Sequence, residues 1–179
     1  MKRIILVTGP PGIGKTSVLR RAVPELKNRD YDVGGMICRE VREGGLRVGF
    51  EIMDLSTGQR GWLAHVNQST GPKIGKYRVN LTDLDVIGAG SILDALQNAD
   101  ILAVDEIGPM ELLSPAFSNA LLKAVESSKP LLGTIHYRLS NSLVDSIKMR
   151  EDTEILKVTY ENRENLQNLI VDKISECLI

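Results

Sequence analysis

Eight consecutive residues near the amino terminus constrain this chain more than any other feature: Gly9-Pro10-Pro11-Gly12-Ile13-Gly14-Lys15-Thr16. The spacing of the two outer glycines, with lysine and threonine directly after the second, predicts a phosphate-binding loop, or P-loop. Residues 4–7 form a short apolar run before the loop, which predicts a buried strand. Apolar residues at helical spacing follow it, and we place the secure part of this helix at 15–23 because Pro24 interrupts the pattern.

The composition of the loop indicates how it would hold a ligand. Pro10 and Pro11 have no N–H group, so the phosphate cradle must come from the amides of residues 12–16. The helix that starts after the loop adds partial positive charge from its amino terminus. We expect Lys15 to reach the outer phosphates and the Thr16 hydroxyl to bind Mg²⁺, so the whole loop is predicted to bind nucleotide.

A second candidate motif follows the apolar run at 101–104, where Asp105 and Glu106 end a predicted strand. Alone, the pair is typical of an ordinary charged strand end; beside a P-loop, it indicates a metal-binding Asp105. We expect Glu106 to act as general base toward water, because a carboxylate one residue further on can face the terminal phosphate. Gly108 joins the predicted nucleotide-binding residues. Glu111 is either a further carboxylate of the site or an acid that starts a helix.

Cations also follow predicted strands. His136 and Arg138 come after the apolar run at 131–135, at the sheet edge where ligands of open α/β folds bind. We predict Arg138 as a catalytic cation, with an ordinary surface residue as the equal alternative, and for His136 we favour the surface interpretation. A further arginine cluster lies in a predicted hairpin, where we favour solvated charges, at Arg39, Arg42 and Arg47.

The order of predicted elements indicates the fold class. Strands and helices alternate along most of the chain, but residues 32–66 suggest an antiparallel β-meander with turns at 43–45 and 56–58. We therefore expect one domain over residues 1–179, an α/β/α three-layer sandwich with a mainly parallel sheet and an inserted meander. The further strands are expected at 101–104, 131–135 and 155–158, and helices end near 98, cover 117–125 and run from 166 to 178.

Charge and cysteine usage exclude several classes of function. The 179 residues contain 22 Lys plus Arg and 23 Asp plus Glu, and a net charge of -1 gives no reason to expect nucleic acid as a partner. Cys38 and Cys177 are isolated in the sequence, which argues against zinc and disulfide frameworks and suggests a reducing cytoplasm. The apolar run at 4–7 is too short for a signal peptide, and no segment approaches the ~20 apolar residues of a membrane span. We expect a monomer.

With these motifs in place, the chain resembles the THEP-type nucleoside-triphosphatase family, thermophile-type relatives of the cancer-related nucleoside triphosphatase. Beyond the P-loop, the likeness includes residues 49–58, 63–64, 75–77, 105–111 and 158–163. The resemblance implies a RecA-like P-loop core and slow, Mg²⁺-dependent hydrolysis of several nucleoside triphosphates, ATP, GTP, CTP, UTP and TTP among them, to diphosphate and phosphate. The chain has no Asn-Lys-x-Asp sequence to recognise guanine, so broad base tolerance is expected.

Two other functions stay open at the level of sequence. A nucleotide or small-molecule kinase would need an acceptor pocket and an arginine-bearing lid, for which only the segment around 39–47 and the segment after His136 are candidates. A nucleotide-dependent module that binds RNA or protein would use slow hydrolysis to time its contact. Release of free phosphate without an acceptor distinguishes the hydrolase from the kinase, and a steep salt dependence of RNA affinity would favour the module.

Overall fold

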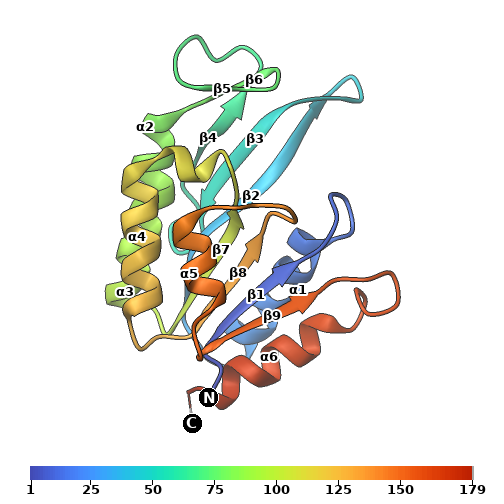
Figure 1. Ribbon diagram of the computed structural model, residues 1–179, viewed down its shortest axis with the longest axis vertical. Coiled ribbons are helices and arrows are strands. Elements are labelled where there is room, and N and C mark those ends of the chain that lie inside the picture. Colours follow the sequence, from blue (N-terminus) through green and yellow to red (C-terminus); the bar gives the residue numbers. More distant parts are fainter. Residues whose placement is uncertain (179) are drawn as a thin grey trace.

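The computed structural model describes residues 1–178, and within them nine strands form one mixed sheet in the order β5-β6-β4-β3-β2-β7-β8-β1-β9 (Figure 1). The half that runs from β2 to β9 is parallel, and β3 to β6 pair antiparallel beyond it. The strands are β1 (Ile4–Thr8), β2 (Val33–Glu43), β3 (Leu46–Asp54), β4 (Arg60–His65), β5 (Lys73–Ile74), β6 (Tyr77–Val79), β7 (Ile101–Ile107), β8 (Leu131–Ile135) and β9 (Thr153–Lys157).

Helices cover both faces of this sheet because its central strands are apolar on both sides. In β1, Ile4 and Leu6 belong to one buried cluster and Ile5 and Val7 to the other, as the two-residue period of a strand requires. One cluster packs under α1 (Lys15–Asn28) and α6 (Leu166–Glu176). The other packs under α3 (Gly90–Asn98), α4 (Pro115–Glu126) and α5 (Ser142–Lys148), of which α3 and α4 lie side by side in Figure 1. The expected α/β fold is therefore confirmed.

Shorter elements complete the chain. A short helix, α2 (Leu81–Asp83), leads into a π-helical turn, η1 (Leu84–Ala89), which continues directly into α3. A 3₁₀ turn, η2 (Glu111–Leu113), follows β7. No helix within residues 1–178 is both long and apolar enough to cross a membrane.

The segment predicted as an inserted meander differs from that expectation in one respect. Its first strand, β2, belongs to the parallel core, because Val33 to Met36 pair in register with Ile101 to Val104 of β7. Only the outer part of β2 turns back as a hairpin onto β3, through Gly44 and Gly45, both with positive φ. The antiparallel strands therefore extend a core strand, and this extension brings β2 beside the motif on β7.

Helix α1 runs past Pro24 and ends at Asn28, which corrects the predicted boundary at residue 23. A proline inside a helix removes one backbone hydrogen bond and costs about 3 kcal/mol in an exposed helix. Here, the turn after Pro24 buries Leu26 completely on the same face as Leu19 and Ala22. Burial of that apolar face offsets the lost hydrogen bond, so packing overrides local propensity.

Candidate active site

The candidate site lies at the carboxyl edge of the parallel strands, where β1 ends at Thr8 and leads into the P-loop. Gly12 and Gly14 have φ of 76° and 113°, a region that side chains with a Cβ rarely adopt. Gly14 is the N-cap of α1, so the loop passes directly into the first turn of that helix. The sequence thus places a helix amino terminus and a glycine-bent loop at one point, the arrangement that binds anions elsewhere.

The loop's own hydrogen bonds refine the predicted cradle. The Ile13 amide donates to the Pro10 carbonyl at 3.2 Å. This amide stabilises the loop itself, so it is not one of the amides that are free to bind phosphate. Lys15 and Thr16 begin α1, where no preceding turn supplies a carbonyl for their amides. The Nζ atom of Lys15 donates to the Gly9 carbonyl at 2.9 Å, which holds the ammonium group across the loop.

Asp105 is fully buried in β7, two residues before the strand ends at Ile107, and two hydroxyl groups fix its carboxyl group. Its Oδ1 atom accepts hydrogen bonds from Thr16 at 3.1 Å and from Thr134 at 2.6 Å. Burial raises the pKa of Asp105 to about 6, while these two hydroxyls act in the opposite direction. The sequence analysis identified Thr16 but not Thr134. The only signal for Thr134 was that it is a polar residue near the end of an apolar strand.

The second oxygen of Asp105 decides whether this site fits a divalent cation. Oδ2 is buried and accepts no hydrogen bond from residues 1–178, although the main-chain N–H of Cys38 lies near the carboxyl group. A buried, unpartnered carboxylate oxygen beside the Thr16 hydroxyl is an oxygen donor set that suits Mg²⁺. Residues 1–178 contain no cluster of three or more His, Cys, Asp or Glu that could hold a metal alone. Mg²⁺ in nucleotide sites commonly takes its remaining ligands from phosphates and water.

Two further carboxyl groups flank the Gly108 backbone after β7. A Cβ at Gly108 would lie 2.8 Å from Oε2 of Glu111, so a larger residue would require the Glu111 carboxyl group to move, and 3.4 Å from Oε1 of Glu106, which is an ordinary contact. Glu106 is half-buried. Glu111 is 4% exposed; its burial and the nearby Glu106 raise its pKa well above the usual range. Glu111 is thus a buried acid near Glu106 and Asp105, and it also starts the 3₁₀ turn η2.

The comparisons with known proteins agree with this arrangement. The profile of the family described as NTPase matches residues 4–171. The chain belongs to this NTPase family. It is 47% identical over 171 residues to the nucleoside-triphosphatase THEP1 of Thermofilum pendens, and the alignment covers 95% of this chain and 94% of that protein.

Solved structures of other members have the same fold as this NTPase. The solution structure of a human cancer-related nucleoside triphosphatase superimposes with a TM-score of 0.82 at 35% identity, covering 97% of this chain and 98% of that one. The crystal structure of THEP1 from Aquifex aeolicus gives a TM-score of 0.84 at 25% identity, covering 96% and 98% of the two chains. The resemblance predicted from sequence motifs is confirmed.

The cationic residues predicted for the site differ in how deeply they are buried. His136 is half-buried beside the site, where its amide donates to the Ile107 carbonyl at 3.1 Å and its Nδ1 atom has no partner among residues 1–178. Arg138 is exposed, with its guanidinium 5.8 Å from the centroid of the Tyr137 ring, and its catalytic role stays a prediction. The hairpin arginines form ion pairs along β2 and β3: Arg39 with Glu51, and Arg42 and Arg47 with Glu40.

Two shallow grooves lie between α1 and strands β2 to β4 of this NTPase, with volumes of about 410 and 340 Å³. Arg20, Ile37 and Met53 line both grooves, and the smaller one reaches Cys38. No P-loop residue lines either groove. Within the P-loop, residues 10–12 are exposed and residues 14–16 are half-buried.

Proposed function

We propose that this chain hydrolyses nucleoside triphosphates, including ATP, GTP, CTP, UTP and TTP, to nucleoside diphosphate and phosphate with Mg²⁺. The observation that carries the proposal is the meeting of three groups at one sheet edge. Thr16 from the P-loop contacts Asp105 from β7, and Glu106 is the next residue along that strand. The relatives' name, nucleoside-triphosphatase, supports the same activity.

The P-loop would bind the triphosphate. The amides of Gly12, Gly14, Lys15 and Thr16 are the donors for phosphate oxygens once Ile13 is excluded. The ammonium group of Lys15 lies across the loop, and from there it would bind the outer phosphates. Together with the amino terminus of α1, these groups stabilise the charge that accumulates on the transferring phosphoryl oxygens.

The Thr16 hydroxyl and the Oδ2 atom of Asp105 are the protein groups that would hold Mg²⁺. When bound, the ion neutralises charge on the outer phosphates. Thr134 positions Asp105 through the hydrogen bond to Oδ1, so that Oδ2 is the oxygen that remains available.

Glu106 would activate the attacking water. Its carboxylate accepts one proton from water while the water oxygen forms a bond to the γ-phosphorus. The bond between the γ-phosphorus and the bridging oxygen breaks, and its electron pair leaves with the β-phosphate. The proton on Glu106 then passes to the released phosphate, which restores the carboxylate. Because water is the nucleophile, no acceptor pocket is required.

The test is a phosphate-release assay with each of the five triphosphates, in the presence of Mg²⁺ and with EDTA in excess. We expect free phosphate from all five with Mg²⁺ and none above background with EDTA, without any added acceptor. The same reactions with radiolabelled γ-phosphate and added mononucleotides test the kinase alternative. Label that appears in a new phosphorylated compound in place of free phosphate would overturn hydrolysis as the function.

A further inference from the structure

The loop that follows β9, residues 158–163, has no part in the chemistry above, yet it is joined to the P-loop strand. The amide of Val158 donates to the Thr8 carbonyl at 2.8 Å. A Cβ at Gly9 would lie 3.2 Å from the Val158 carbonyl oxygen, so the two backbones are in close contact. Figure 1 shows the P-loop and the β9 loop projecting from the same edge of the sheet. The β9 loop is therefore the immediate neighbour of the P-loop.

The strand order determines whether the β9 loop lies beside the phosphate end or the nucleoside end of the substrate. Along the sheet, β7 and β9 lie on opposite sides of β1, with β8 between β7 and β1. Asp105 and Glu106 on β7 define the side of the γ-phosphate. In-line attack requires the leaving diphosphate to lie on the far side of the γ-phosphorus from the attacking water. The nucleoside must then leave the P-loop away from β7, toward β9.

The β9 loop is held rigidly in place. The amide of Thr159 donates to Oδ1 of Asn162 at 2.8 Å, and the amide of Asn162 donates back to the Thr159 hydroxyl at 3.3 Å. The side-chain amide of Asn162 also donates to the Lys157 carbonyl at 2.9 Å. From α1, the guanidinium of Arg21 donates to the Arg163 carbonyl. A loop fixed by four side-chain hydrogen bonds presents its outer residues in one arrangement.

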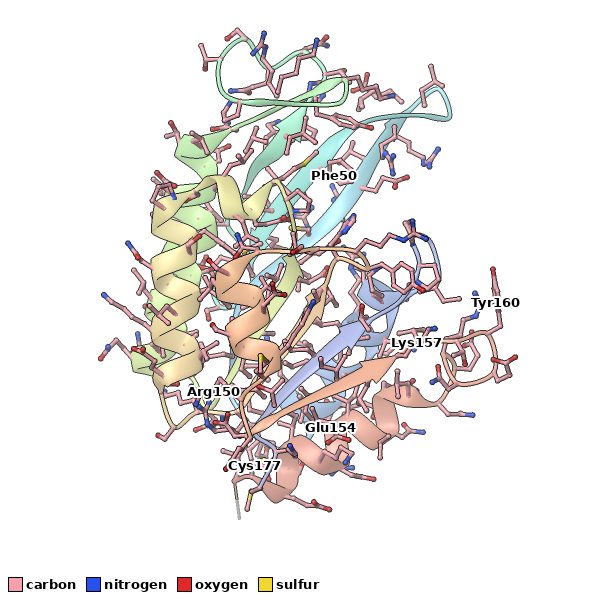
Figure 2. All side chains as sticks on the ribbon, in the orientation of Figure 1. Phe50, Arg150, Glu154, Lys157, Tyr160 and Cys177 are labelled. Atoms are coloured by element: carbon pink, nitrogen blue, oxygen red, sulfur yellow. The ribbon has the colours of Figure 1, made fainter. Side chains whose placement is uncertain are left out.

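The outer residue of this rigid loop is an aromatic side chain without a role in packing. Tyr160 is 75% exposed, and Figure 2 shows it at the end of the loop, beyond Lys157. The guanidinium of Arg163 lies 5.2 Å from the centroid of its ring. An exposed aromatic ring beside a cation is the kind of surface on which nucleic-acid bases stack.

We propose that Tyr160, supported by Arg163, is the stacking surface for the base of the bound nucleotide. The inference rests on the proposed triphosphate substrate and names the residue that contacts its nucleoside part. Stacking is tolerant of base identity because every base has a π-face. The expected breadth of substrates then follows from contact with the face of the base rather than its edge.

Calorimetry with non-hydrolysable β,γ-imido analogues of ATP, GTP, CTP and UTP, each with Mg²⁺, tests the proposal. Inorganic tripolyphosphate with Mg²⁺ serves as the probe that has no nucleoside. For Tyr160→Ala we expect Kd for each nucleotide to rise about tenfold, more for purines than for pyrimidines, while Kd for tripolyphosphate stays the same. Tyr160→Phe retains the ring and is expected to restore nucleotide affinity.

Leu46→Ala is the matched control, since Leu46 is 71% exposed at the β2–β3 hairpin and lies outside the P-loop, residues 105–111 and the β9 loop. An unchanged nucleotide Kd in Tyr160→Ala would overturn the stacking surface. An equal loss of tripolyphosphate affinity would also overturn it, because the effect would then lie in the phosphate loop. So would a loss confined to one base, which indicates recognition of a base edge. Binding requires no turnover, so these outcomes are separate from failure of the proposed hydrolysis.

Discussion

Thr134 on β8 donates a 2.6 Å hydrogen bond to the Oδ1 atom of Asp105 on β7. The two side chains meet because Val104 and Gly133, the residues just before them, are paired in the parallel ladder. Both residues are fully buried. The proposed metal-binding carboxylate is therefore oriented by a neighbouring strand as well as by the P-loop, and this second partner yields a direct test of the site.

We predict that Thr134→Val raises the Mg²⁺ concentration needed for half-maximal activity about tenfold or more, the usual effect of losing a residue that orients a metal ligand. Valine has nearly the same shape as threonine but cannot donate to Asp105, whose carboxyl group is then free to turn. Titration of phosphate release with Mg²⁺ at saturating ATP measures the change.

Thr153→Val is a matched control for this experiment. Thr153 is also a buried strand threonine, but its hydroxyl has no hydrogen-bond partner among residues 1–178. We expect it to leave the Mg²⁺ requirement unchanged. An identical Mg²⁺ requirement in Thr134→Val and the wild type would contradict the orienting role of Thr134.

Glu106→Gln separates binding from turnover. Glutamine has the same shape but cannot accept the proton of the attacking water, so we expect turnover to fall about 100-fold or more while affinity for the Mg²⁺–nucleotide analogue is retained. Single-turnover phosphate release and calorimetry measure the two quantities. Glu126→Gln, an exposed acid at the end of α4, is the control. Normal turnover in Glu106→Gln would exclude Glu106 as the base.

Lys15→Ala tests the P-loop itself. The variant removes the ammonium group held across the loop at the Gly9 carbonyl, so we expect severe loss of affinity for nucleotide and for tripolyphosphate alike. Lys27→Ala changes a lysine further along the same helix and is expected to have no effect on either. Loss of nucleotide binding alone, with tripolyphosphate binding intact, would contradict the assignment of Lys15 to the phosphates.

Much of the candidate site could be predicted from sequence because its residues lie in short, continuous segments. The spacing from Gly9 to Thr16 fixes a loop conformation locally, and the apolar run before Asp105 identifies the strand, although β7 continues to Ile107, beyond the predicted end. Thr134 and the position of Glu111 could not be predicted in the same way. Their roles depend on which strands are neighbours and on burial, and neither property is encoded by local spacing.

The fold was predictable to a similar extent. Apolar runs located the buried strands β1, β7 and β8 because both of their faces are covered. Several short elements escaped the sequence analysis, among them the two-residue strand β5, the three-residue strand β6, the seven-residue helix α5 and the π-helical turn η1. Such short segments carry too little periodicity to be recognised.

The buried carboxyl group of Glu111 should make stability depend on pH. An unfolded glutamate has a pKa of about 4.3, and burial holds the pKa of Glu111 well above its usual range in the folded state. Between these two values the folded state binds more protons than the unfolded state, so stability falls as pH rises, with a limiting slope of about 1.4 kcal/mol per pH unit. Asp105 contributes a similar fall in stability, which ends near its pKa of about 6.

Glu111→Gln has no charge at any pH, so we expect its urea midpoint, measured without Mg²⁺, to decline less than that of the wild type from pH 6 to 8. Parallel curves for the two proteins over that range would show that Glu111 ionises in the folded state as readily as in the unfolded chain.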